Sequence, residues 1–244
     1  MENRMSIVIT MAGLGNRFRK AGYNCPKYMI EAKGKSLFEW SMDSLIGFSQ
    51  HSSKYIFVVR KEDKATDFIK EKCKQYDITE IEIIELDGLT DGQATTALLA
   101  IPYVNLDDAF MVYNIDTYVE PYEMRFNEIE GDGYIPCFYA EGDHWSFVKL
   151  DENGNAIEVR EKQRISDNCT LGAYYFSSAK LYKKIYEEYY KDAENVEKSE
   201  KYIAPMYNYM IQKGYIVKIT QINSKKVHVL GTPEELEEFK LEKT

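Results

Sequence analysis

Apolar residues recur along this chain in short unbroken runs, separated by segments in which they recur every three or four positions. Such runs are typical of buried strands, and the wider spacing is typical of amphipathic helices. In the first half, strands are predicted over residues 5–11, 55–59, 80–85 and 109–114. The run over 80–85 alternates apolar and acidic residues, so we expect this strand nearer an edge of its sheet.

Helical segments fall between these strands and set the fold class. Helices are predicted over residues 37–45, 62–73 and 92–100, the first preceded by Ser36 as a cap residue. Strands that alternate with helices favour a mostly parallel, Rossmann-like central sheet with helices on both faces. In such α/β sheets, ligands bind beyond the carboxyl ends of the strands.

The second half of the chain is richer in strands and turns, so we expect a smaller β-rich portion there. A turn over 151–155 separates two of its apolar runs, which is a hairpin signal. Its strands are predicted over residues 134–139, 146–150, 157–162, 170–176 and 215–222. Its helices are predicted over residues 178–190, over 203–213 and from the cap residue Thr232 onward.

Length and charge narrow the class of protein. The 244 residues contain no Pro/Gly/Ser-rich linker and no internal repeat, so one domain, 1–244, is predicted. A net charge of -9 argues against a nucleic-acid partner, which needs a basic surface. An anionic small molecule remains compatible, because a local group of cations dominates its own surroundings even on an acidic protein.

Targeting signals and cysteines indicate the expected cellular compartment of the protein. The sequence contains no apolar run of about 18 residues, so no membrane span is predicted. It leads directly into an apolar strand, without the apolar core and cleavage site of a signal peptide. Its cysteines form no Cys-x-x-Cys pair, which is typical of reduced thiols. We therefore expect a cytoplasmic protein, and the sequence indicates no particular oligomeric state.

The first candidate for chemistry is the loop after the first strand. Gly13-x-Gly15-x-Arg17 follows residues 5–11, and Lys27 comes ten residues after the arginine. Glycines let a backbone approach a ligand that a Cβ would obstruct, and the N–H groups of such a turn bind anions. The two side chains add positive charge. The spacing fits neither a Walker loop nor the dinucleotide fingerprint, which needs a third glycine.

Asp116 is the second candidate. It follows the predicted strand 109–114, so its carboxylate is expected at the same sheet edge as the glycine loop. An aspartate at a strand end often caps a turn or a helix, and the residue alone leaves both interpretations open. The agreement of the two candidates at one edge favours a binding site there.

Together these motifs resemble a known signature. Gly13-x-Gly15-x-Arg17 followed by Pro26-Lys27 is similar to that of the nucleotidyltransferases that activate sugar phosphates, including glucose-1-phosphate thymidylyltransferase-like enzymes and related cytidylyltransferases. The resemblance implies a nucleotide-binding half, 1–125, and an acceptor-binding half, 126–244. It extends over nearly the whole chain, through residues 145–162, 166–167, 171–176, 202–208 and 230–236.

The resemblance implies a role for each candidate residue. Arg17 and Lys27 are the implied catalytic residues, acting on the phosphates, and Asp116 contacts the nucleotide and holds Mg²⁺. Mg²⁺ prefers carboxylate and phosphate oxygens and retains water, which suits one aspartate and a triphosphate. The other implied nucleotide-binding residues are Ala12, Gly13, Gly15, Gly88 and Gln93. The implied acceptor-binding residues are Glu161, Lys162, Gly172 and Tyr202.

Some of these positions have an ordinary structural alternative. Gln93 offers a donor and an acceptor to a nucleobase, and it equally fits the exposed first turn of a helix. Glu161 and Lys162 also fit a solvated charged pair at a strand end.

The chain departs from the family pattern at one place. Many relatives carry an aspartate just before the final Gly-Thr, where it completes the metal site. Here Val229 and Leu230 stand at that place, with His228 beside them. Either the second ligand comes from elsewhere, or Asp116 and the substrate phosphates suffice. His228 is a candidate substitute, although a histidine beside a strand end is more often packed or solvated.

The reaction implied is attack by an acceptor phosphate oxygen on the α-phosphorus of a nucleoside triphosphate, with release of pyrophosphate. The nucleophile is already anionic, so no general base is required. A pyrimidine triphosphate is favoured, CTP slightly ahead. The acceptor is a sugar 1-phosphate or another phosphomonoester, and the product would serve capsule or surface-polysaccharide synthesis.

Two other classes of protein remain open from the sequence. A metal-dependent glycosyltransferase uses a similar sheet with a metal-holding Asp-x-Asp, and this chain has Asn114-x-Asp116. A catalytically silent nucleotide-binding module is suggested by the missing late aspartate.

Overall fold

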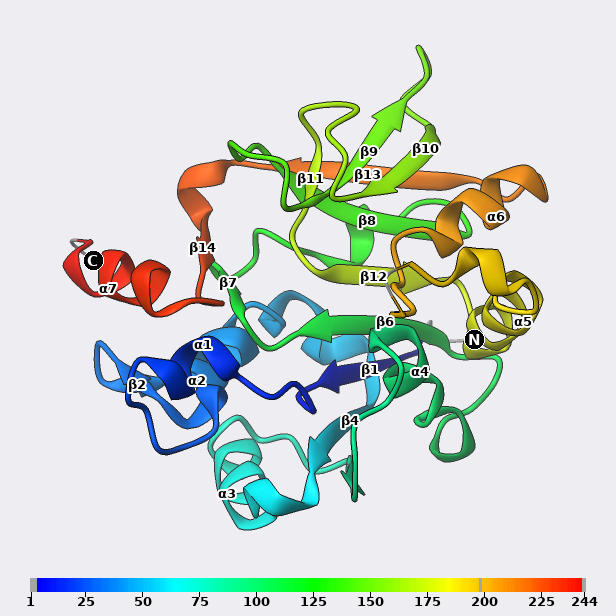
Figure 1. The fold of residues 1–244 in the computed structure, drawn as a ribbon. Helices are drawn as coiled ribbons and strands as arrows, with labels where there is room; N and C mark the ends of the chain where they lie inside the picture. Colours follow the sequence, from blue (N-terminus) through cyan, green and yellow to red (C-terminus); the bar gives the residue numbers. More distant parts are fainter. Residues whose placement is uncertain (1–3, 198, 243–244) are drawn as a thin grey trace.

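One ten-stranded sheet runs through the molecule in the computed structural model, which describes residues 4–197 and 199–242 (Figure 1). Its strands are β1 (Met5–Thr10), β4 (Ser52–Arg60), β5 (Ile81–Leu86), β6 (Ala109–Asn114), β8 (Gly133–Phe138), β9 (Ser146–Leu150), β10 (Ala156–Glu161), β11 (Cys169–Thr170), β12 (Ala173–Phe176) and β13 (Val217–Ile222). They follow the order β10-β9-β11-β8-β12-β6-β1-β4-β5, and β13 pairs with β8. The predicted α/β class is confirmed.

The first-half strands form the parallel part of this sheet. β1 lies between β4 and β6 and is parallel to both, and β5 adds in parallel at the edge, where its alternating pattern places it. Val8, Ile56 and Val112 are completely buried. Strands covered on both faces need apolar side chains at every position, which explains the unbroken runs in the sequence.

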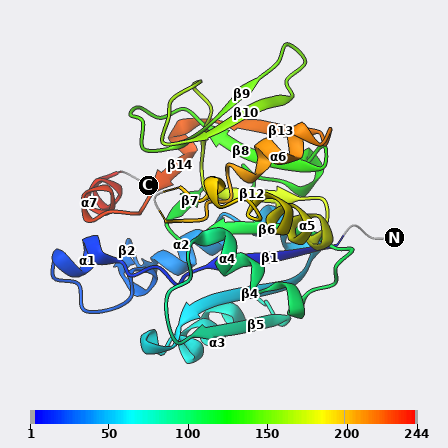
Figure 2. The same ribbon diagram turned by 45° about the vertical axis from the view of Figure 1, so that its right-hand side comes forward.

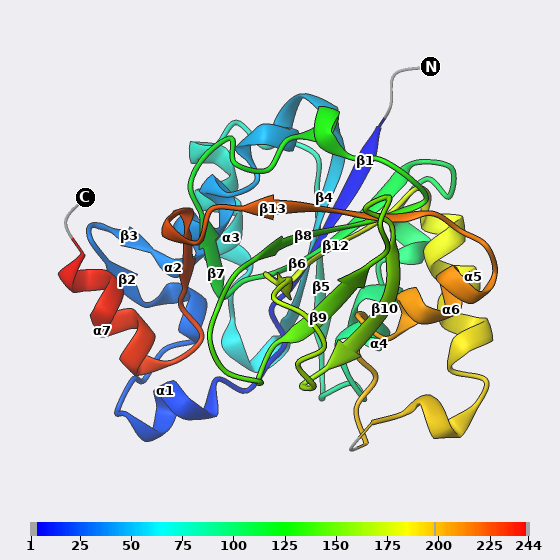
Figure 3. The same ribbon diagram turned by 90° about the horizontal axis from the view of Figure 1, so that it is seen from above.

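The helices cover both faces of the sheet. They are α1 (Asn16–Lys20), α2 (Leu37–Asp43), α3 (Thr66–Gln75), α4 (Gln93–Leu98), α5 (Ala179–Tyr189), α6 (Met206–Gln212) and α7 (Pro233–Leu241). Figure 3 shows α2 and α3 on one side and α4, α5 and α6 on the other. Phe38 of α2 packs on Phe57, with ring centroids 5.5 Å apart, and Tyr182 of α5 packs on Phe110 at 4.7 Å. Each face therefore has its own aromatic core.

Antiparallel pairs appear in the second half. β9 and β10 form the predicted hairpin, and β12 pairs antiparallel with β6, which joins the two halves into one sheet. The single predicted strand over 170–176 is wrong, because the chain divides there into β11 and β12. Gly172 lies between them with φ of +88°, a left-handed conformation that interrupts a strand.

Two predicted helices begin later than expected. α3 begins at Thr66 because residues 61–63 form a 3-10 turn that ends at Lys64, whose φ is +49°. α6 begins at Met206, directly after Pro205. The other 3-10 turns are Lys27–Met29, Ile46–His51, Ile101–Tyr103, Phe126–Glu128, Ala193–Asn195 and Ser224–Lys226.

The C-terminal segment returns to the beginning of the chain. β14 (Val227–Val229) pairs antiparallel with β7 (Thr117–Val119), while β2 (Glu31–Ala32) and β3 (Lys35–Ser36) form a second small sheet. Figure 2 shows α7 beside α1 and β2. Trp40 and Phe239 meet with ring centroids 5.2 Å apart. The first turn of α7 is thereby brought to the edge of the sheet that carries Asp116.

The described part of the chain contains no helix that is long and apolar enough to cross a membrane.

Candidate active site

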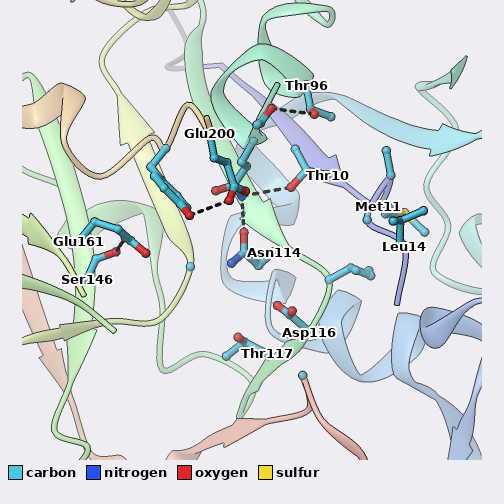
Figure 4. Close-up of a pocket in the computed structure, with 18 of the residues that line it drawn as sticks. Thr10, Met11, Leu14, Thr96, Asn114, Asp116, Thr117, Ser146, Glu161 and Glu200 are labelled. Carbon is cyan, nitrogen blue, oxygen red and sulfur yellow. Dashed lines mark hydrogen bonds between the residues drawn. The ribbon is translucent and has the colours of Figure 1, made fainter. Parts of the chain in front are cut away.

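A cleft of about 920 Å³ opens beyond the carboxyl ends of β1 and β6, between the two halves of the chain. In Figure 4, Met11 and Leu14 line one side, Ser146 and Glu161 line the opposite side, and Asp116 lies between them. This size suits a ligand as large as a nucleotide.

The glycine loop forms the wall at the end of β1. Met11 N–H donates to Val58 O at 2.8 Å, and after this bond the chain leaves the sheet. Gly15 has φ of +60° and precedes α1, on which Phe18 is buried and anchors the helix to the core. The glycine supplies the left-handed turn that starts the helix. This turn brings Arg17 to the cleft.

Lys27 and Asp116 form an ion pair at the centre of the cleft. Lys27 Nζ donates to Asp116 Oδ2 at 2.7 Å, and the two side chains are 19% and 30% exposed. Burial acts to raise the pKa of Asp116, but the charge and hydrogen bond of Lys27, together with the charge of Arg17, outweigh burial and hold that pKa below its usual range. The carboxylate is therefore ionised at neutral pH and holds a cation.

Gln93 connects three elements at the rim of the sheet. Its side-chain nitrogen donates to Thr10 Oγ1 at 3.1 Å and also to Asn114 Oδ1. With the amide nitrogen engaged in this way, its carbonyl oxygen is left to accept a hydrogen bond from a ligand.

A chain of polar side chains lies at the opposite end of the cleft. Glu161 accepts from Ser146 Oγ and lies 3.2 Å from Lys162 Nζ, which donates to Tyr202 OH at 3.1 Å. Tyr202 OH in turn donates to Glu200 Oε2 at 2.6 Å. Burial lowers the pKa of Lys162, but the hydrogen bond to Tyr202 and the charge of Glu161 outweigh it and raise the pKa. This end therefore presents a protonated lysine beside two carboxylates.

A solved structure is similar to this chain over nearly its whole length. A solved nucleoside-diphosphate-sugar pyrophosphorylase from Vibrio cholerae RC9 is 37% identical to this chain, with a TM-score of 0.89. The match covers 97% of this chain and 100% of that one. The chain belongs to the sugar-phosphate nucleotidyltransferase family.

More distant matches share the fold. An inositol-1-phosphate CTP transferase from T. maritima is 16% identical with a TM-score of 0.76, covering 96% of this nucleotidyltransferase and 91% of that chain. A CTP:phosphocholine cytidylyltransferase from Streptococcus pneumoniae is 18% identical with a TM-score of 0.75, covering 97% and 98%. Both show the same fold.

A longer curated protein also matches the nucleotidyltransferase. The bifunctional protein GlmU of Methanocaldococcus jannaschii is 28% identical over 194 residues, which are 75% of this chain. The chain spans 41% of the length of that relative. No family model matches the chain.

The cleft of this nucleotidyltransferase brings together most of the site residues predicted from the sequence. Those that line it are Ala12, Gly13, Arg17, Lys27, Gln93, Asp116, Glu161, Lys162, Gly172 and Tyr202. Gly15 instead lies directly before α1, where a methyl group placed on it would lie 3.9 Å from Lys27 Cβ. Gly88 lines an adjoining hollow with Arg60 and Leu89. The individual roles of these residues remain predictions.

His228 does not supply a ligand at the place of the missing aspartate. β14 places Val229 opposite Thr117, next to Asp116, but the ring of His228 stacks on Tyr118 at 5.2 Å. Its Nδ1 lies 2.8 Å from Glu242 Oε2. Among the described residues, no group of three His, Cys, Asp or Glu side chains forms a metal site.

Several cleft residues were given no role in the favoured function by the sequence, and Asn114 was named only for the glycosyltransferase alternative. They are Thr10, Asn114, Ser146, Glu200 and Glu235. Asn114 ends a predicted strand, and ligands of such sheets bind at the carboxyl ends of the strands. Its position could therefore have predicted that it lines the site. Glu235 stands three residues after Thr232, a spacing that is typical of a helix cap. The cap alone explains the glutamate, so the sequence provided no reason to expect it in the cleft.

The lowered pKa of Asp116 predicts a pH dependence of stability. A carboxyl group with a depressed folded-state pKa stabilises the fold above its unfolded value, about 3.9, and this contribution is lost as the pH falls through the folded value. We expect the Tm difference between wild type and Asp116→Asn to be constant from pH 7 to 5 and to change below about pH 4. Melting curves of both proteins from pH 7 to 3 test this, and a difference that does not vary with pH contradicts it.

Proposed function

We propose that this protein couples a pyrimidine nucleoside triphosphate, with CTP slightly ahead, to a sugar 1-phosphate or another phosphomonoester and releases pyrophosphate. The observation that carries the proposal is the cleft itself. It places Arg17, Lys27 and Asp116 at the carboxyl edge of the sheet, with Lys162 at the opposite end. Two anionic substrates would thus each meet cations.

The main obstacle to this reaction is the repulsion between two polyanions. Unit charges 5 Å apart repel by about 3 kcal/mol at an effective dielectric constant of ~20, and several such pairs are involved. We assign Arg17 and Lys27 to the triphosphate and Lys162 to the acceptor phosphate. No proton has to be removed from the nucleophile, so the residues act by positioning and by balancing charge.

A magnesium ion fits the residues around Asp116. The carboxylate is ionised and already pairs with a cation, Lys27, which shows that it favours positive charge at this place. When bound with the triphosphate, Mg²⁺ would neutralise charge on the phosphates and polarise them.

The names of structural relatives support the proposed class of donor. Two structures of the same fold are named as a CTP transferase and a cytidylyltransferase, and others as a thymidylyltransferase and a UDP-glucose pyrophosphorylase. All four names indicate pyrimidine nucleotides, which supports the expected class of base. We place the reaction in the cytoplasm and in capsule or surface-polysaccharide synthesis.

The glycosyltransferase alternative is less well supported by the contacts of Asn114. Its side-chain oxygen accepts from Gln93, and a methyl group on Gly172 would lie 2.5 Å from its side-chain nitrogen. The side chain lines the cleft, but its oxygen is engaged by Gln93, whereas an Asp-x-Asp site needs a carboxylate at this position that is free to bind the metal ion.

Thermal shifts test which nucleotide binds. We expect one triphosphate among CTP, UTP, dTTP, GTP and ATP to raise the Tm, and only with Mg²⁺ present. A ligand at a hundred times its Kd stabilises the fold by about 2.7 kcal/mol, which corresponds to about 5–10 °C for a chain of this size. Asp116→Asn is the control variant, and in it the triphosphate should no longer give the Mg²⁺-dependent rise in Tm. A shift with a nucleotide sugar but with no triphosphate would support the glycosyltransferase instead.

A further inference from the structure

A second carboxylate lies beside Asp116 on the far side of Gly231. Leu230 N–H donates to Asp116 O at 2.8 Å, which holds the end of β14 against the loop after β6. A methyl group placed on Gly231 would lie 3.5 Å from Asp116 Oδ2 and 3.5 Å from Glu235 Oε2. One oxygen of each carboxylate therefore lies close to the same point beside Gly231, and both residues line the cleft.

Glu235 is held in this orientation by the start of α7. Gly231 N–H donates to its Oε2 at 2.9 Å, and its own N–H donates to the cap residue Thr232 at 3.2 Å. The next residue, Leu236, is completely buried, so the first turn of the helix is fixed to the core. The carboxylate is positioned before any ligand arrives.

The two carboxylates differ in whether a cation lies beside them. Lys27 lies on Asp116, 2.7 Å from its Oδ2. Within the part of the chain that the structure describes, no Lys, Arg or His nitrogen lies within 4.0 Å of the Glu235 carboxylate. A carboxylate with no cation beside it that lines a cleft for phosphates would repel them, unless a divalent cation lies between the carboxylate and the phosphates.

We infer that Glu235 is a second carboxylate that positions the divalent ion of Asp116, in place of the aspartate that is absent at Val229. The inference rests on the proposed function. Val229 lies opposite Thr117, next to Asp116, so its own side chain brings no charge to this place. Glu235, in the first turn of α7, lines the same cleft as Val229 and would bind the ion directly or through one of the waters that Mg²⁺ retains.

Binding of Mn²⁺ to the full-length protein tests this inference. Free Mn²⁺ is measured by electron paramagnetic resonance in titrations of wild type, Asp116→Asn, Glu235→Gln and Glu234→Gln, each with and without CTP. Glutamine at 235 has the same size and still accepts the Gly231 N–H bond, so the fold should persist, and melting curves check this. Glu234 is the matched control, because it is an exposed glutamate in the same helical turn.

We expect Glu235→Gln to weaken Mn²⁺ binding by about 10-fold or more and Glu234→Gln to leave it unchanged. The inference is wrong if Glu235→Gln binds Mn²⁺ as wild type does while Asp116→Asn does not, and the proposed function then stands. It is also wrong if the wild-type protein binds no Mn²⁺ in the presence of nucleotide. The absence of pyrophosphate release with any triphosphate would instead contradict the proposed function, whatever the Mn²⁺ titration shows.

Discussion

Replacement of Lys27 by alanine is expected to lower the rate of pyrophosphate release by about 100-fold while the protein remains folded. The ammonium group lies 2.7 Å from Asp116 Oδ2, at the point where the phosphates and the metal ion would meet. Its loss would remove one of the two cations that we assign to the triphosphate. The lysine is 19% exposed and its removal leaves the Asp116 carboxylate without its ion-pair partner, so we expect a moderate fall in the Tm with the fold retained.

A pyrophosphate-release assay and a melting curve on the same samples test this prediction. Lys20→Ala is the matched control, because Lys20 is an exposed lysine at the end of α1. A Lys27→Ala enzyme that retains more than about a tenth of the wild-type rate would contradict the assigned role. Asp116→Asn should lower the rate of pyrophosphate release by a factor similar to that of Lys27→Ala. Since the two groups contact each other, the double variant should be far less impaired than the product of the two single effects.

Replacement of Gly92 by alanine is expected to lower both stability and activity. Gly92 has φ of +138°, a region that is essentially restricted to glycine and costs other residues about 1–3 kcal/mol. A methyl group there would also lie 2.4 Å from Lys201 O and 2.5 Å from Lys201 N. Lys201 O accepts from Ala94 N–H and Lys201 N–H donates to Asp91 O, so both bonds must shift.

The displaced segment carries two residues of the end of the cleft where we propose that the acceptor binds. Glu200 and Tyr202 flank Lys201, and Tyr202 OH accepts from Lys162 Nζ and donates to Glu200. We therefore expect Gly92→Ala to weaken acceptor use in addition to lowering the free energy of unfolding. Urea denaturation and the KM for the acceptor are the measurements.

Gly154 provides the matched control for this variant. Its φ is +75°, and a methyl group there would meet no described atom within 4 Å. Gly154→Ala should cost only the backbone strain, about 1–2 kcal/mol, and leave KM unchanged. Equal effects of the two variants on stability and on KM would contradict the role assigned to the contact with Lys201.

The sequence predicted most of the fold because the central strands are buried on both faces. The run over 109–114 coincides with β6, since a fully covered strand has to be apolar throughout. The error over 170–176 has the opposite cause. Thr170 and Ala173 suit a strand equally well, and only the left-handed conformation of Gly172 divides the segment.

The site was predictable where its chemistry is local and unpredictable where it depends on the fold. The glycine loop and Lys27 stand close together in the sequence, so their spacing carried the signal. Asp116 is 89 residues away from Lys27, and their direct contact follows only from the sheet order β4-β1-β6. Glu235 reaches the cleft because β14 pairs with β7. Each of these strands has only three residues, which is too short a pattern to predict their pairing from the sequence.

The most direct test of the account is pyrophosphate release from a matrix of triphosphates and phosphorylated acceptors. Wild-type protein is incubated with each of CTP, UTP, dTTP, GTP and ATP, with and without Mg²⁺, against sugar 1-phosphates and other phosphomonoesters. The account predicts release from a pyrimidine triphosphate that requires both Mg²⁺ and an acceptor and is lost in Lys27→Ala. Consumption of a nucleotide sugar, with no pyrophosphate from any triphosphate, would contradict it.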